Sequence, residues 1–205
     1  MSKPKAKRGR PKTLDRKQAI SVAMRAYWSE DVESVSLNEI CRRAELSKPG
    51  LYREFGNEDG LTKAVLVTYR KQFLAPVYQM IAAGAPFRET LDSLVSIVTR
   101  NGSAPMLNDD QEVPNGCLLV KMREAYRHLG EETRKEADHA KEKALTVYED
   151  WVERAKAAGE FGEMSSRFAA IYIDAQLNNA LSLLARGEPS DEVKKILTVA
   201  FSMLG

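Results

Sequence analysis

Cysteine, histidine and long apolar runs are scarce in this chain of 205 residues, which holds only two cysteines and two histidines. No run of about 18 apolar residues is present, so we expect no membrane span. Cys41 and Cys117 are too few for a disulfide framework, and His128 and His139 add no zinc-ligand spacing, so we expect neither metal nor cofactor. The basic N-terminus has no apolar stretch behind it, which disfavours a secretory signal and leaves the cytoplasm as the expected location.

Strand patterns and catalytic constellations are also lacking. No segment alternates convincingly between apolar and polar residues, and the repeats follow helical spacing instead, so the sequence predicts an all-α fold. It shows no paired carboxylates, no glycine-rich phosphate loop and no nucleophile with an evident base, which disfavours an enzyme. Asp174 is an isolated acid within an apolar helix, and we interpret it as a residue at an interface.

Positive charge gathers in the N-terminal quarter of the chain. Residues 1–56 hold 13 Lys and Arg against 7 Asp and Glu, whereas the remainder holds 18 against 22. Attraction to phosphates supplies most non-specific affinity for DNA, so this asymmetry favours nucleic acid as the partner of the N-terminal part.

The stretch 36–55, SLNEICRRAELSKPGLYREF, predicts two short helices joined by a tight turn. Ser36 and Glu39 form a capping box, in which a hydroxyl and a carboxylate each satisfy a free backbone donor at a helix start. The first helix then has apolar residues at i, i+3, i+4 and i+7, with Arg42 and Arg43 facing outward. Two capped amphipathic helices can also be plain packing units, so this pattern alone does not decide the function.

The second helix of the pair is expected to begin at the cap Ser47, with Pro49 in its first turn. Its outer face is predicted to carry Lys48, Gly50, Tyr52 and Arg53. Such a helix N-terminus, with a cation and little bulk, suits insertion into a major groove about 12 Å wide.

Residues 1–12 contain six cations and no acid, and we expect them to form a disordered basic arm. Basic tails often serve only solubility. Here Arg8 and Arg10 flank a glycine in RGRP, a pattern that suits entry of guanidinium groups into a narrow minor groove.

About nine helices are predicted in all, arranged as a basic arm (1–12), a three-helix helix-turn-helix unit (13–57) and a helical bundle (58–205). Pro76 is expected to kink or end the fourth helix. The predicted helices span 14–28, 37–44, 47–55, 58 into the seventies, a stretch opened by Pro86, 116–129, 131–158, 165–185 and 190–204.

At motif level, residues 9–69 resemble the TetR family of one-component transcriptional regulators. The resemblance rests on GRPK, AxxAYW, VSLNEICRRA, LSKPGLYREF and GLTKAVL, and the run SxxxLYxxF is its most characteristic part. The resemblance implies a DNA-binding helix-turn-helix followed by helices that hold a ligand and form a dimer. The remaining residues agree with the family in length and helical pattern but carry no motif of similar specificity.

Site residues follow from this resemblance. It places Lys48, Pro49 and Gly50 near base edges and Ser36 and Tyr52 on phosphates, with the cap Ser47 beside them. Lys48 would carry much of the direct readout, to guanine O6 and N7. The sequence departs from the family pattern in several places: Asp31 and Val32 replace a glycine and an aromatic, Glu45 replaces a turn glycine, and Glu58 replaces a phosphate-binding lysine, for which Lys63 is the expected substitute.

The C-terminal helices are predicted to supply a dimer interface and a pocket. A two-fold dimer would place two recognition helices about 34 to 36 Å apart on a pseudo-palindromic operator in double-stranded DNA, and residues 165–204 are the expected dimer surface. The 165–185 helix has a competing interpretation as the central core helix of a bundle. Aromatics with polar tips suit a cavity for a small-molecule effector, although each one alone also fits a plain core. The candidates are Tyr69, Phe73, Leu94, Val98, Met122, Tyr126, Trp151, Tyr172 and Gln176.

Three functions remain open at this point. The leading hypothesis is a repressor that leaves DNA when a small molecule binds one of its conformations better than the other. The alternatives are a regulator or activator without a ligand, and an electrophile sensor in which Cys117, at a predicted helix start, has a lowered thiol pKa. A buried, inert cysteine is the competing interpretation of Cys117.

Overall fold

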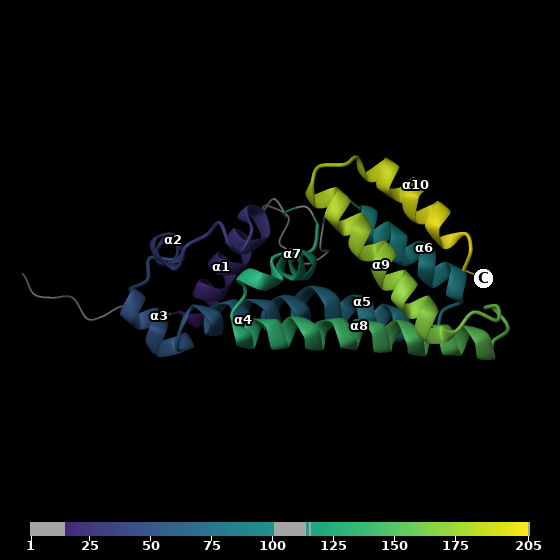
Figure 1. Ribbon diagram of the computed structural model, residues 1–205, viewed down its shortest axis with the longest axis horizontal. Helices are drawn as coiled ribbons and strands as arrows, with labels where there is room; N and C mark the ends of the chain where they lie inside the picture. The colour runs from purple at the N-terminus through teal and green to yellow at the C-terminus, as the bar shows by residue number, and fades with distance from the viewer. Residues whose placement is uncertain (1–14, 101–113, 115, 205) are drawn as a thin grey trace, which may run out of the picture.

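The computed structural model of the protein describes residues 15–100, 114 and 116–204, and within these ranges the regular structure is entirely helical (Figure 1). The predicted all-α fold is confirmed. The α-helices are α1 Arg16–Glu30, α2 Leu37–Arg43, α3 Lys48–Phe55, α4 Glu58–Tyr69, α5 Ala75–Ala82, α6 Phe87–Thr99, α7 Leu118–Glu124, α8 Glu131–Ala157, α9 Ser166–Ala185 and α10 Ser190–Phe201.

Side chains cap the beginning of several of these helices. Asp15 accepts hydrogen bonds from the backbone N–H of Lys17 and Gln18 at 2.9 and 3.1 Å. Asn57 accepts one from Gly60 at 2.8 Å and so opens α4. Each cap satisfies donors that have no partner inside the helix.

Pro76 does not end the helix that contains it. α4 continues through a π-helical segment, Arg70–Leu74, directly into α5, and Pro76 lies in the first turn of α5. The wider turn, in which Ala75 N–H bonds the carbonyl of Arg70, relieves the clash that a proline ring makes one α-helical turn back. With α4 to α5 counted as one rod, the described residues form nine helical rods, as expected.

Several helix ends differ from the sequence-based expectation. The helix predicted over 116–129 ends at Glu124 and is followed by a 3-10 turn, Tyr126–His128. The helix predicted over 190–204 ends at Phe201.

Two apolar cores divide the molecule along its long axis. The first joins α1–α4 with α7 and the beginning of α8, and the second joins α6, α9 and α10 with the rest of α8. Figure 1 shows α4 and α5 running beside α8 along the length of the molecule, with α1–α3 at one end and α6, α9 and α10 at the other. Because α4 packs on both α1 and α8, the domain boundary expected near residue 57 stays a prediction.

A single carboxylate fastens the beginning of α4 to the beginning of α8. Asp59 accepts hydrogen bonds from the backbone N–H of Glu132 and Thr133, at 2.8 and 3.0 Å, and from the Thr133 hydroxyl at 2.5 Å. A Cβ on Gly130 would lie 2.1 Å from the carboxyl carbon of Asp59, so only glycine allows this approach. Asp59 therefore caps a helix to which it does not belong.

The net effect of this contact is to lower the pKa of Asp59. Partial burial alone would raise that pKa, but the hydrogen bonds from Thr133 and from the two backbone N–H groups outweigh it. Ion pairs from Lys63 to Glu132, at 2.8 Å, and from Arg70 to Glu136 continue the same junction along α4 and the π-helical segment.

We predict that Asp59→Ala lowers the free energy of unfolding by about 1 to 2 kcal/mol at neutral pH, because it removes a helix cap. A carboxylate with a lowered folded-state pKa stabilises fully above its ordinary pKa of 3.8, and that stabilisation is lost as the pH falls through the lowered value. Urea unfolding at neutral and acidic pH should therefore show a difference between wild type and variant that shrinks with acid. Glu58→Ala, on the exposed neighbour, is the control, and an equal loss in both variants would contradict the prediction.

Candidate nucleic-acid interface and internal cavity

The α2–α3 pair forms the expected helix-turn-helix. Glu45 in the turn has a left-handed backbone with φ +55°, at the position where the family pattern has glycine. The next residue, Leu46, donates its N–H to the carbonyl of Cys41 at 2.8 Å and so ends α2. Ile40 and Leu51 are fully buried between the two helices and the rest of the first core.

The beginning of α3 is presented to solvent. Ser47 caps it, with its Oγ accepting the N–H of Gly50 at 3.2 Å, and Ser47, Lys48 and Pro49 are exposed. Free N–H groups and the positive end of the helix dipole there suit a phosphate or a base-edge acceptor. The prediction that Gly50 lies on the outer face of α3 is wrong. Gly50 is buried, and its N–H donates to the cap residue Ser47.

Lys48 and Tyr52 share one exposed face of α3, one turn apart. The Lys48 ammonium lies 5.8 Å from the centre of the Tyr52 ring, and Tyr52 is 40% exposed. The ring restrains the long lysine side chain through a cation–π contact and leaves its charge accessible. This face offers one cation and one phenolic hydroxyl to a partner.

The outward arginines of α2 are held by acids, a feature that the sequence reasoning missed. Ser36 accepts the N–H of Glu39 at 3.3 Å, but the Glu39 carboxylate binds Arg42 and Arg43 instead of completing the capping box. Hydrogen bonds from these two guanidinium groups lower the pKa of Glu39 to about 2. Arg43 also pairs with Glu30 of α1, so it ties α2 to α1.

The other predicted DNA contacts lie elsewhere. Lys63 is on α4, and its ammonium is paired with Glu132 at the α4–α8 junction. Ser36 is exposed at the beginning of α2. Arg8 and Arg10, with the whole basic arm, lie outside the described residues.

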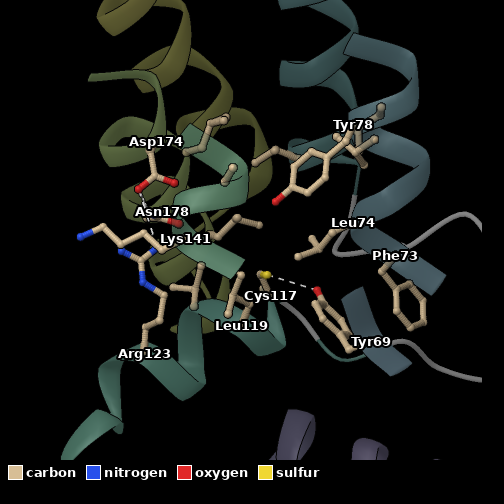
Figure 2. Close-up of a pocket in the computed structure, with 18 of the residues that line it drawn as sticks. Tyr69, Phe73, Leu74, Tyr78, Cys117, Leu119, Arg123, Lys141, Asp174 and Asn178 are labelled. Atoms are coloured by element: carbon tan, nitrogen blue, oxygen red, sulfur yellow. Dashed lines mark hydrogen bonds and ion pairs between the residues drawn. The ribbon is translucent and has the colours of Figure 1, made fainter. Parts of the chain in front are cut away.

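A cavity of about 130 Å³ lies between α4–α5, α6, α7, α8 and α9. Four of the predicted pocket residues line it: Tyr69, Phe73, Leu94 and Val98. Figure 2 shows side chains from the α4–α5 rod facing α7 and α9 across this space. Trp28, from the end of α1, also lines it, so the cavity touches the helix-turn-helix unit.

The other five predicted pocket residues do not line the cavity. Met122 is fully buried in the first core, Tyr126 is on the surface with its hydroxyl on Asp138 at 2.8 Å, and Trp151 packs on Phe87 in the second core. Tyr172 and Gln176 are on α9, turned away from the cavity-lining face. Spacing in the sequence shows that a residue faces inward, but it does not show which of several buried spaces that residue faces.

Charged and polar residues that the pocket prediction omitted meet at one end of the cavity. Asp174 accepts a hydrogen bond from Asn178 at 2.8 Å and lies 3.7 Å from a guanidinium nitrogen of Arg123, with Lys141 also in the wall (Figure 2). Burial raises the pKa of Asp174, although Arg123 and Asn178 oppose the shift. The expectation that Asp174 lies at an interface is wrong, since its carboxylate is buried within the chain. The sequence signal for a buried functional acid at this position was the isolation of Asp174 within an apolar helix.

Cys117 lies just before α7 and is buried against the cavity. Its sulfur accepts a hydrogen bond from the Tyr69 hydroxyl at 3.2 Å. Burial raises the pKa of the Cys117 thiol, more than this bond and nearby backbone N–H groups lower it. The hypothesis of a lowered thiol pKa is therefore wrong.

Comparison with known proteins identifies the helix-turn-helix unit. The family profile described as "Bacterial regulatory proteins, tetR family" matches residues 19–65, which cover most of α1 and α4 and all of α2 and α3. This part of the chain therefore matches the TetR family of helix-turn-helix domains. The resemblance seen in the sequence motifs is confirmed, and the chain carries the DNA-binding unit of a transcriptional regulator.

Known proteins resemble this chain in sequence over part of its length and in fold over most of it. The chain is 41% identical over 71 residues, 35% of its own length, to the HTH-type transcriptional repressor ComR of Escherichia coli (strain K12), and the match spans about a third of ComR, 34%. The structure of CifR in complex with a 26-bp operator DNA has a TM-score of 0.77 at 20% identity, covering 96% of this chain and 100% of that one. Reduced E. coli NemR gives 0.75 at 14% identity, covering 93% and 97%. At these identities the two structures show the fold alone.

We predict that Lys48→Ala weakens binding to a specific DNA site by about ten- to a hundredfold, as expected for loss of one base-edge contact. Lys143→Ala is the matched control, because it removes the same charge from an exposed position in the middle of α8. Mobility shifts at several salt concentrations measure both variants. Equal affinities for the two variants would remove Lys48 from the interface.

Proposed function

We propose that this TetR-family chain is a ligand-responsive repressor that binds a pseudo-palindromic operator as a homodimer and is released by a small molecule in the cavity. The observation that carries the proposal is the position of Trp28. This residue belongs to α1 of the helix-turn-helix unit, and its indole forms part of the cavity wall. A molecule that enters the cavity therefore contacts the DNA-binding unit directly.

α7 supports this coupling because it lines the cavity and also contacts α1, beside which it lies in Figure 1. The Trp28 indole N–H donates to the carbonyl of Gly116 at 3.2 Å, and the Lys121 ammonium donates to the carbonyl of Trp28 at 2.6 Å. Lys121 also pairs with Asp31 at 3.1 Å, just after α1 ends. Displacement of α7 would pull on the end of α1 through these bonds.

The mechanism is a shift between two arrangements of α7 and α1. A ligand changes this equilibrium only by the difference in its affinity for the two arrangements. In the dimer, a small rotation of each α1–α3 unit changes the spacing of the two α3 helices, which must match successive grooves about 34 to 36 Å apart.

We predict that Lys121→Met retains DNA binding and loses much of its response to effectors, because two bonds between α7 and the end of α1 disappear. The assay is a mobility shift with DNA from upstream of the protein's own gene, repeated with a panel of small organic compounds. Lys135→Met is the matched control, since that lysine pairs only with Glu131 on the surface of α8. Undiminished release of Lys121→Met by a compound that releases wild type would contradict the coupling route.

The proposed dimer surface is an apolar patch on α9 and α10. Its members are exposed in the single chain although they are large and apolar, and Val199 is 74% exposed. Contiguous exposed apolar surface marks interaction sites. A two-fold contact between last helices would cover it with its own copy. The patch comprises Phe168, Ile171, Ile196, Val199 and Met203.

We predict that Val199→Asp converts the dimer to a monomer, because a carboxylate buried between two apolar faces is strongly disfavoured. Sedimentation equilibrium measures the mass of the variant, and circular dichroism confirms that it remains folded. Thr146→Asp, at an exposed position on α8, should leave the dimer unchanged. A dimeric Val199→Asp protein would place the interface elsewhere.

The competing functions have less support. A regulator or activator without a ligand would leave the polar end of the cavity without a role, and undiminished DNA binding in the presence of every compound would favour it. An electrophile sensor needs a reactive thiol, whereas the Cys117 thiol is buried with a raised pKa. Because the proposed partner is double-stranded DNA in a bacterial cell, the proposed location is the cytoplasm. In the part of the chain that the structure describes, no helix has the length and hydropathy to span a membrane.

A further inference from the structure

The cavity is apolar along most of its wall and charged at one end. Leu94, Val98 and Leu177 are among the apolar lining residues, and Arg123 and Lys141 stand with Asp174 at the charged end (Figure 2). Two cations and one carboxylate line this end, so its formal charge is positive, although the amine of the exposed Lys141 points away from the cavity (Figure 2). An apolar wall with one charged end selects a ligand that has both parts.

The guanidinium of Arg123 has N–H donors that remain available to a ligand. Its contact with the Asp174 carboxylate is an ion pair of 3.7 Å between the nearest nitrogen and oxygen, which is longer than a normal hydrogen bond. The Asp174 carboxylate, in contrast, already accepts from Asn178 at 2.8 Å. The group at the charged end with N–H donors left for a ligand is thus Arg123, whose side chain is 25% exposed and which an acceptor on a ligand would bond.

Two tyrosines add neutral donors to the same wall. Tyr78 and Tyr148 both line the cavity, and Figure 2 shows the Tyr78 hydroxyl pointing into it. Burial raises the pKa of both phenols, so each keeps its proton. Neither hydroxyl donates to a described residue. The two tyrosine hydroxyls therefore also favour a ligand whose polar group accepts hydrogen bonds over one whose polar group donates them.

The volume limits the size of the ligand. An engineered protein cavity of about 150 Å³ with an apolar lining holds benzene, and this cavity measures about 130 Å³. One six-membered ring or a short aliphatic chain fits without displacement of the helices. A larger molecule would have to separate α7 from α9 or from the α4–α5 rod.

We propose that the cavity binds a small organic carboxylate. Its oxygens accept hydrogen bonds from the guanidinium of Arg123, and its ring or short chain lies on the apolar wall. The proposal rests on the proposed function only in taking the cavity as the effector site. Carboxylate and guanidinium match in a two-bond geometry that an ammonium does not offer. Asp174 repels the incoming carboxylate and stays held by Asn178.

The charge of the ligand sets opposite signs for two substitutions. For a carboxylate, Arg123→Gln removes the acceptor's partner and weakens binding by about tenfold or more, the size expected for a charge-assisted hydrogen bond. Asp174→Asn removes the repulsion and frees Arg123, so it tightens binding. For a cationic ligand, both signs reverse.

The test uses the full chain without DNA, in a Trp151→Phe background that leaves Trp28 as the only tryptophan. Benzoate, phenylacetate and the short aliphatic butyrate are the carboxylate probes. Benzylamine, a cation, and benzamide, a neutral compound, are comparison probes of about the same size as benzoate. Calorimetry and Trp28 fluorescence measure binding. Arg127→Gln, an exposed arginine outside the cavity, is the control, and circular dichroism shows that each variant is folded.

Binding of a carboxylate that is weakened by Arg123→Gln, tightened by Asp174→Asn and unaffected by Arg127→Gln supports the proposal. Tighter binding of benzylamine or benzamide, an unchanged affinity in Arg123→Gln, or no binding of any of the three carboxylates overturns it. Carboxylate binding without DNA release would reject the coupling in the proposed function and keep this assignment. Release from DNA by a neutral or cationic compound instead would keep the coupling in the proposed function and reject the assignment of a carboxylate ligand.

Discussion

The rest of the structure depends on the contact in which Asp59 caps α8. The carboxylate belongs to the first turn of α4, yet it satisfies the backbone donors at the beginning of α8, the longest helix among the described residues. α4 is the helix on which α1 and α3 pack, so its fixed angle against α8 also fixes the direction in which α3 faces. Gly130 is required there because any side chain would occupy the space of the carboxylate.

From this junction the chain extends in two directions. Toward one end, α3 exposes Lys48 and Tyr52 on one face, while Leu51 and Phe55 are buried where α3 packs on α2 and α4. Toward the other, the α4–α5 rod, made continuous across Pro76 by a π-helical turn, forms one wall of the cavity. Trp28 connects the two ends, since it lies in the last turn of α1 and lines the cavity. The same rod thus contacts both the helix-turn-helix unit and the cavity.

Local patterns in the sequence predicted the helices well and the cavity poorly. The caps at Ser47 and Asn57 and the apolar repeats are encoded within a few residues, so the helix-turn-helix and the all-α fold followed from them. Contacts between residues distant in the chain were not accessible: nothing local pairs Asp59 with Thr133 or Trp28 with Gly116. Tyr126 and Trp151 were expected in the pocket because aromatic spacing marks an inward face without telling one buried space from another. Asp174 was noticed, but its partner Arg123 lies about fifty residues away on α7.

The most direct test of this account is the DNA affinity of Asp59→Ala, measured at a temperature where the variant is fully folded. Fluorescence anisotropy with an operator from upstream of the gene, and with an unrelated duplex of equal length, gives specific and non-specific affinities. If the Asp59 contact sets the direction of α3, the variant loses specific affinity and keeps its non-specific affinity, because its surface cations are unchanged. A folded variant with wild-type specific affinity would contradict the account.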